Sequence, residues 1–430
     1  MRPTLRQREG TRFRLYTHPP LDGEPGRLVT VRVSSPAGSL GPGPSDHRMY
    51  AVNPVGKEMP YGLVPGPIGE TLYLPPWDGP VVPPPRPGPG GHFDHIPPDD
   101  PAFAAVHLFG AVRFTLDVWE AYLGEEIPWH FQSDYERLEL SMIETWANAH
   151  MGYGYLETGA RRDETGHLLP YALNFDIIAH EIGHAILVAM TGPFVPGTVP
   201  EAFEAFHEMS SDWVALIASL HFDSVIDELL ENTSGNLDTF NRFSRFGEVS
   251  SSAQIRLANN SRTLDEFTDG WENEHQLAQP LIGAFFDIFV DTYHEILLEM
   301  GAVPPALEDL ADRAERDSGL RPHVQRGFDR AYERAPDAFR EALEEVRDLS
   351  AEYLIAIWER IEKESFTFSD LRRITVDIDR ERTGGRLSRL LDNSFLFRRI
   401  GQSRVGARLR APDENSHAYS ARMLAPVRNQ

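Results

Sequence analysis

The chain has 430 residues, of which 41% are apolar, so it is long enough to bury a sizeable core and to form two or three domains. Its formal net charge of −24 argues against nucleic acid or an anionic membrane as a partner, because neutralising phosphates requires clustered Lys and Arg. The sequence contains no cysteine, which excludes disulfides and thiolate ligands to a metal.

Residues 1–100 form a segment rich in Pro and Gly. Short β-like runs cover Arg12–Tyr16, Leu28–Val33 and Glu70–Leu74, and the low-complexity tract from Pro75 to Gly91 is typical of extended chain. The first residues lack the apolar core of a signal peptide, and no apolar run reaches the roughly 18 residues that a membrane span needs. A cytoplasmic location is the default expectation, and secretion stays open.

Residues 101–200 are predicted to form an α/β lobe that ends in a helix with two histidines. This helix begins near Asn174 or Asp176, contains His180-Glu181-Ile182-Gly183-His184 and ends at Gly192-Pro193. Positions i and i+4 share one face of an α-helix, so both imidazoles can bind one ion while Glu181 points at the water beside it. This spacing indicates a zinc hydrolase. The alternative is a buried helix whose histidines bond to backbone carbonyls.

A second predicted helix, at about residues 200–220, supplies a candidate third ligand. Glu208 and Asp212 are again four residues apart, and apolar residues directly after them place both carboxylates beside a buried stripe. Because a catalytic zinc has three protein ligands and one position for water, we expect Glu208 to join His180 and His184. Asp212 is expected to accept the N–H of His180. The competing interpretation is an acidic, solvated helix face.

Beyond residue 276 the sequence predicts helices followed by a polar tail. The expected helices are Gln276–Met300, Pro305–Asp317, Val324–Tyr332, Pro336–Lys363 and Phe368–Arg380. The predicted fold class is α+β. Its predicted parts are an N-terminal segment with short strands (1–100), an α/β lobe with the zinc helix (101–200), a helical lobe with the third ligand (201–400) and a polar C-terminal tail (401–430).

Two motifs resemble those of the thermolysin-like branch of the gluzincin metallopeptidases. Asp176-Ile177-Ile178-Ala179-His180-Glu181 is similar to the start of that family's active-site helix, and Glu208-x-x-Ser211-Asp212 is similar to its Glu-x-x-Ser-Asp. The resemblance covers about residues 100–300. It implies a two-lobed α+β enzyme with a β-containing N-terminal lobe, a mainly helical C-terminal lobe and one zinc ion in the cleft between them.

Weaker matches imply contacts with a peptide substrate. Ile255-Arg256-Leu257 resembles the family's Leu-Arg segment, whose arginine contacts the substrate carbonyl. His275-Gln276-Leu277-Ala278 resembles its His-x-x-Ser, whose histidine donates to the oxyanion. Asn148-Ala149 resembles the pair on an edge strand that binds the substrate backbone. Ile177 and Ile255 match positions that line the family's apolar pocket for the substrate residue after the scissile bond.

The chain also departs from the family pattern. No tyrosine lies between His184 and Glu208, where the family has a second oxyanion donor. Gly270 stands where the family has the aspartate that orients the oxyanion histidine, so Asp269 or Glu272 would have to replace it. The acidic loop cluster that holds structural calcium in relatives is not recognisable, and we expect no calcium site.

The sequence therefore predicts a zinc-dependent endopeptidase that acts on peptides or proteins. Glu181 would be the general base, and His275 and Arg256 would contact the transition state. An aminopeptidase or a peptidase dedicated to one substrate is an alternative with the same chemistry. A non-catalytic binding protein on a metallopeptidase scaffold is an alternative of another class, against which the intact Glu181 argues. The natural substrate, the oligomeric state and the role of residues 1–100 stay open.

Overall fold

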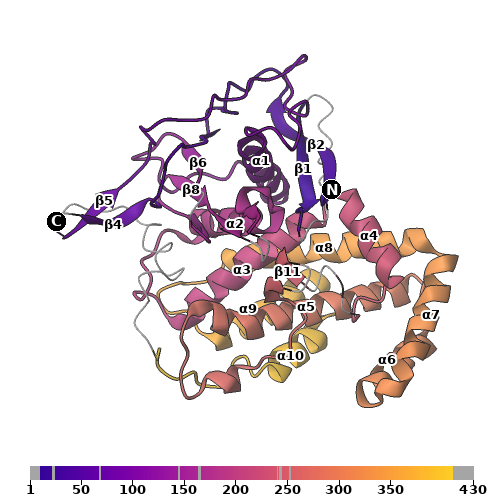
Figure 1. The fold of residues 1–430 in the computed structure, drawn as a ribbon. Coiled ribbons are helices and arrows are strands. Elements are labelled where there is room, and N and C mark those ends of the chain that lie inside the picture. The colour runs from indigo at the N-terminus through magenta and orange to yellow at the C-terminus, as the bar shows by residue number, and fades with distance from the viewer. Residues whose placement is uncertain are drawn as a thin grey trace.

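The computed structural model describes residues 10–21, 25–66, 69–143, 146–162, 166–239, 241, 245–250 and 253–409. Figure 1 shows strands and helix α1 (Phe103–Leu123) gathered in one part of the molecule and a group of long helices in another. Helices α2 (Phe175–Thr191) and α3 (Glu201–Ser219) lie between the two parts (Figure 1). A strand-containing N-terminal region followed by a helical C-terminal region confirms the predicted α+β class.

The first hundred residues pack against the rest of the fold. β1 (Gly10–His18) and β2 (Arg27–Pro36) form an antiparallel hairpin, and β4 (Gly62–Gly66) and β5 (Gly69–Tyr73) form a second one. The alternating apolar side chains of β1 point inward, and the Phe13 ring stacks on Phe109 of α1 with 5.8 Å between the ring centroids. The three predicted N-terminal strands therefore coincide with β1, β2 and β5.

A four-stranded sheet has the order β3-β6-β8-β7. Its strands β3 (Met49–Ala51), β6 (Leu138–Met142) and β8 (Tyr155–Thr158) are parallel, and β7 (Ala149–Met151) is an antiparallel edge strand. β7 packs on α2. The short hairpin of β9 (Ala160–Arg162) and β10 (Leu168–Pro170) and the 3-10 turn η1 (Tyr171–Leu173) then lead into α2.

A buried ion pair fastens the N-terminal segment to this sheet. Lys57 Nζ lies 2.6 Å from Glu157 Oε1 of β8, and the two side chains are 1% and 0% exposed. Glu157 also accepts hydrogen bonds from the Tyr61 backbone N–H and from His150 Nε2, both at 2.7 Å. The Lys57 ammonium lies 3.0 Å from the centroid of the Tyr61 ring. The polar contacts offset the cost of taking both charges out of water.

Replacing Lys57 by Met should destabilise the protein by about 3–5 kcal/mol, because it leaves the Glu157 carboxylate buried without its cation. Urea unfolding curves measure the change in free energy. The control is Lys363→Met, which removes the other lysine of the chain. The Lys363 side chain is 16% exposed, and its Nζ donates to the Thr191 carbonyl. We expect about 1 kcal/mol for the control. Equal effects of the two substitutions would contradict a structural role for the buried pair.

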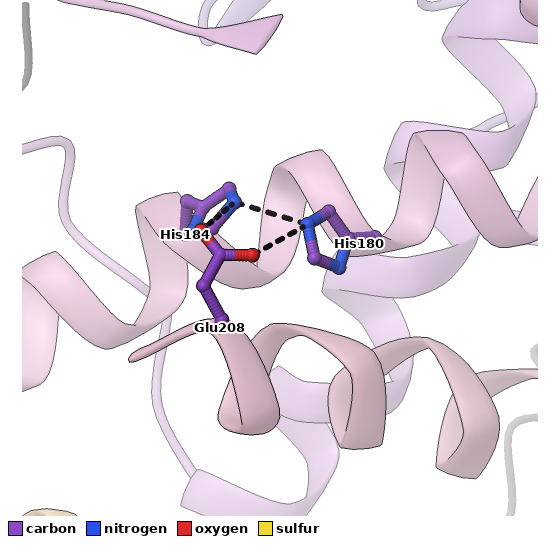
Figure 2. A group of neighbouring side chains, drawn as sticks. All are labelled: His180, His184 and Glu208. Carbon is purple, nitrogen blue, oxygen red and sulfur yellow. Dashed lines mark hydrogen bonds and ion pairs between the residues drawn. The ribbon is translucent and has the colours of Figure 1, made fainter. Parts of the chain in front are cut away.

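Helices α2 and α3 run close together (Figure 2). A Cβ atom added to Gly183 of α2 would lie only 2.7 Å from the Ser211 Cα of α3, so a glycine is needed at this crossing. The close approach of the two backbones brings the histidines of α2 to the carboxylates of α3.

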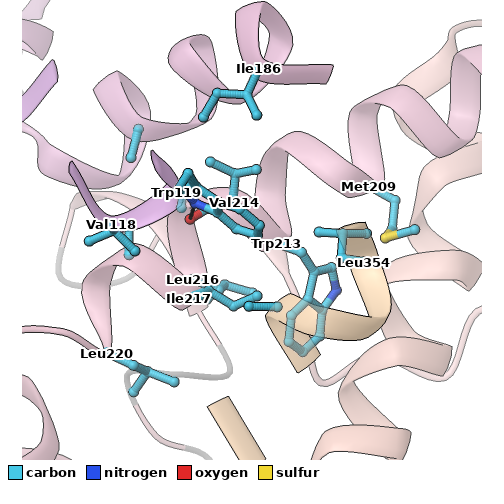
Figure 3. Packing of buried hydrophobic residues seen from close by; sticks show 14 of the residues in the cluster. Val118, Trp119, Ile186, Met209, Trp213, Val214, Leu216, Ile217, Leu220 and Leu354 are labelled. Atoms are coloured by element: carbon cyan, nitrogen blue, oxygen red, sulfur yellow. Dashed lines mark hydrogen bonds between the residues drawn. The ribbon is translucent and has the colours of Figure 1, made fainter. Parts of the chain in front are cut away.

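The core around these helices is continuous, as Figure 3 shows for side chains from α1, α2, α3 and α8 (Pro336–Trp358). Trp119 of α1 is fully buried and its Nε1 donates to the Val214 carbonyl of α3 at 3.2 Å. Trp213 of α3 packs beside Phe289 with 5.8 Å between their ring centroids. Burying such large apolar side chains on every side fixes α2 and α3 relative to each other.

The C-terminal region is helical apart from one described hairpin, formed by β11 (Arg245–Ser250) and β12 (Ala253–Leu257). Its helices, besides α8, are α4 (Asp223–Thr233), α5 (Glu274–Glu299), α6 (Pro305–Arg316), α7 (Arg321–Arg334), α9 (Phe368–Thr383) and α10 (Ser388–Phe397). Within the described ranges, no helix has both the length and the apolar content needed to cross a membrane.

Two features of this region differ from the prediction. Helices α4 and α10 were not predicted, and α8 ends at Trp358 although the helical pattern continues to Lys363. The chain turns after Trp358, and the Lys363 ammonium donates to the Thr191 carbonyl at the end of α2. A cation at a helix C-terminus is stabilised by the carbonyl groups that the helix leaves unpaired. Because Lys363 makes this contact at the end of α2, the chain between Trp358 and Lys363 turns away from the axis of α8.

Candidate metal centre

Helix α2 carries His180, Glu181 and His184 into the interior. Asn174 caps the helix, since its side-chain oxygen accepts the Ile177 N–H at 3.3 Å, and the helix ends at Gly192, which has a φ of 79°. His180 follows the cap by less than two turns of helix and His184 by almost three. The three residues are each at most 8% exposed.

The two histidines converge with Glu208 of α3 (Figure 2). Their Nε2 atoms are 3.1 Å apart. Glu208 Oε2 lies 3.6 Å from His180 Nε2, and Glu208 Oε1 lies 3.8 Å from His184 Nε2. Nitrogen and oxygen ligands at about 2.0–2.1 Å from a tetrahedral zinc are about 3.3–3.4 Å from each other, within the observed range. The three side chains therefore fit a single metal ion.

Asp212 contacts one of these candidate ligands, His180, on the side away from Glu208. Its Oδ1 is 2.7 Å from His180 Nδ1, and the carboxylate is 1% exposed. Accepting the Nδ1–H leaves the lone pair of His180 on Nε2, the atom that faces Glu208. The i, i+4 spacing on α3 places both carboxylates against the same histidine.

Glu181 is buried beside the metal group and is held by the edge strand. Its Oε2 accepts the backbone N–H of Met151 in β7 at 2.9 Å. Burial raises the pKa of the Glu181 carboxyl above its ordinary value. A carboxylate with a raised pKa is a stronger proton acceptor, which suits a general base.

His275 lies in the first turn of α5, two residues after Asn273, which caps the helix. Its Nδ1 is 2.8 Å from Glu208 Oε2, so the ring contacts the candidate third ligand. From the sequence, Asp269 or Glu272 would have to orient His275; both are exposed, and a carboxylate in contact with the ring is that of Glu208. The reason is tertiary: the packing of α5 against α3 brings the two residues together.

The predicted substrate-binding pair Asn148-Ala149 lies at the start of the edge strand. Ala149 is in β7, and the Asn148 carbonyl accepts the Gly159 N–H at 2.7 Å. The residue of this strand that contacts Glu181 is Met151, two positions after Ala149, for which the sequence predicted no role.

The remaining predicted residues are placed only in part. Ile177 lies in the first turn of α2 and is buried. The backbone of Ile255 and Arg256 forms β12, where Arg256 pairs with Phe246, but their side chains lie outside the described part of the structure.

No protein-family model matches the chain, and no curated protein matches it. Among solved structures, the chain is similar to the precursor of protealysin, a metalloproteinase from Serratia proteamaculans, with a TM-score of 0.43 and 11% sequence identity. The similarity covers 76% of this chain and 83% of that chain.

Proposed function

We propose that the protein is a zinc-dependent peptidase of the thermolysin-like gluzincin type. The observation that supports this most directly is the convergence of His180, His184 and Glu208 beside a separate buried carboxylate, Glu181. Two imidazoles and one carboxylate form a donor set used by catalytic zinc sites, which keep a fourth position open. We expect one zinc ion per chain.

The metal ion and the protein side chains would supply different parts of peptide hydrolysis. Zinc held by His180, His184 and Glu208 would lower the pKa of a bound water toward about 7 and would polarise the scissile carbonyl. Glu181 accepts a proton from the attacking water and passes it to the leaving amine, while the Met151 N–H holds one carboxylate oxygen in place. Asp212 fixes the ring of His180 through Nδ1.

We assign the stabilisation of the oxyanion to His275. Its Nδ1 faces Glu208 Oε2, and its Nε2 is the ring nitrogen that would donate to the substrate oxygen. Arg256 is the proposed second contact, on the substrate carbonyl. The roles of His275 and Arg256 are inferred from the resemblance of their sequence segments to the family motifs.

Replacing His275 by Ala should lower kcat by about 10²- to 10³-fold, because an oxyanion donor acts mainly in the transition state. Zinc content should not change. Steady-state kinetics on a peptide substrate, with metal analysis of the same samples, measure both quantities. His294→Ala is the control, since it removes a histidine from the same helix about 28 Å further along the axis. Loss of zinc in His275→Ala would instead make His275 a residue that holds Glu208.

Digestion of a peptide library by the zinc-loaded protein tests the type of activity. Internal cleavage that stops in Glu181→Gln supports an endopeptidase. Stepwise loss of N-terminal residues would support the alternative, an aminopeptidase. A protein that binds zinc tightly but cleaves no peptide would be the non-catalytic binding protein.

A further inference from the structure

The second metal-binding histidine has its own contacts on the side away from the ligand group. Ser211 of α3 is fully buried, and its Oγ lies 3.0 Å from His184 Nδ1. The same Oγ lies 3.0 Å from the backbone carbonyl oxygen of His207, one turn earlier on α3. The close approach of Gly183 and Ser211 brings this hydroxyl within reach of the His184 ring.

These two contacts determine the direction of the hydrogen bonds. A carbonyl oxygen can only accept, so the single hydroxyl proton of Ser211 points to His207 O. Oγ then faces His184 Nδ1 with a lone pair, and Nδ1 must carry the proton of the neutral ring. The ring's other nitrogen, Nε2, keeps its lone pair and faces His180 and Glu208.

His207 also touches the same nitrogen. Its Nδ1 lies 3.2 Å from His184 Nδ1, and the two rings stack with 4.7 Å between centroids and 29° between planes. The stacked ring restricts rotation of His184. A neutral imidazole nitrogen can either donate or accept, so His207 alone would leave the proton of His184 undetermined, whereas Ser211 determines it.

We propose that Ser211 is a positioning residue of the metal site, which selects the metal-binding tautomer of His184 as Asp212 does for His180. Two consecutive residues of α3 thus hold the two histidines of α2, one through a hydroxyl and one through a carboxylate. The inference rests on the metal site of the proposed function, and it does not depend on which reaction that site catalyses.

The test compares zinc affinities at pH 7.5, measured by competition with a chelator of known affinity. Ser211→Ala should bind zinc about 10- to 100-fold more weakly than the wild type, the range for removing a hydrogen-bond partner of a metal ligand. The matched control is Ser210→Ala: Ser210 is the neighbouring residue, equally buried, and its Oγ accepts from Trp358 Nε1 instead. We expect the control to bind zinc within about threefold of the wild type.

Further variants separate the possible causes. Ser211→Cys keeps the size and a weaker acceptor, so it should fall between Ser211→Ala and the wild type, and it carries the test if the Ala variant does not fold. His207→Phe keeps the stacked ring but removes Nδ1, and it should weaken zinc binding less than Ser211→Ala does. Absorption bands of the Co²⁺-loaded proteins should shift in Ser211→Ala and not in Ser210→Ala, because they report ligand geometry.

The zinc affinities distinguish a failure of the role of Ser211 from a failure of the metal site or of the peptidase activity. Zinc affinity of Ser211→Ala within threefold of the wild type would overturn the assignment to Ser211, as would a larger loss in His207→Phe. A wild-type protein that binds no zinc would overturn both the metal site and this inference. A wild type that binds zinc but cleaves no peptide would overturn only the proposed peptidase activity, and a weakened Ser211→Ala would still support the role of Ser211.

Discussion

Replacing Glu181 by Gln is expected to reduce peptide hydrolysis by about 10³-fold or more, about 4 kcal/mol in the activation free energy, while zinc binding and fold are retained. Gln has nearly the same shape, and its amide oxygen can still accept the Met151 N–H. It cannot accept a proton from water. Glu181 lies outside the group His180, His184 and Glu208, so the metal should stay in place.

The measurement combines kcat on a peptide substrate with zinc content and a thermal unfolding curve. Glu204→Gln is the matched control, because Glu204 is an equally buried glutamate of α3 that accepts a backbone N–H, from Gly197. The control should stay within a few-fold of the wild-type kcat. A Glu181→Gln variant with more than a tenth of the wild-type activity would contradict the assignment of the general base.

The parts of the site that sequence periodicity determines could be predicted. His180 and His184 share a face because four residues make about one helical turn, and the same spacing applies to Glu208 and Asp212 on the second helix. Once two such helices cross, only a few side chains can meet. The group of three candidate metal ligands follows from this geometry.

The contacts that could not be predicted all depend on how separate elements pack. The Met151 N–H reaches Glu181 because β7 packs on α2, and His275 reaches Glu208 because α5 packs on α3. The family resemblance indicated an edge strand at Asn148-Ala149, but nothing in the local sequence shows that Met151 lies against Glu181. The contact between Ser211 Oγ and His184 Nδ1 likewise depends on the crossing of α2 and α3 at Gly183.

The N-terminal segment illustrates the same limit. The sequence predicted short strands in this segment and extended chain at Pro75–Gly91, but it indicated neither that β3 joins the four-stranded sheet nor that Lys57 is buried on Glu157. A single lysine in a proline-rich stretch gives no sign of burial, because lysine is almost never fully buried unless it is paired. The partner, Glu157, lies a hundred residues later, so only the folded structure shows the pair.

Removing the metal is the second change with a large expected effect. Elemental analysis should find about one zinc per chain, and a chelator should abolish peptide hydrolysis, which added zinc restores. His180→Ala should lose both the metal and the activity, because it removes one of three proposed ligands and the imidazole that the buried Asp212 contacts. His47→Ala, at an exposed histidine remote in sequence from the helix, should change neither.

A second readout of the metal does not require activity. Zinc that binds only the folded protein stabilises it by mass action, by about 2.7 kcal/mol when its free concentration is 100 times the dissociation constant. The melting temperature of the wild type should therefore rise with added zinc, and that of His180→Ala should not. If zinc stabilises both proteins equally, the ion binds elsewhere and His180 is not a ligand.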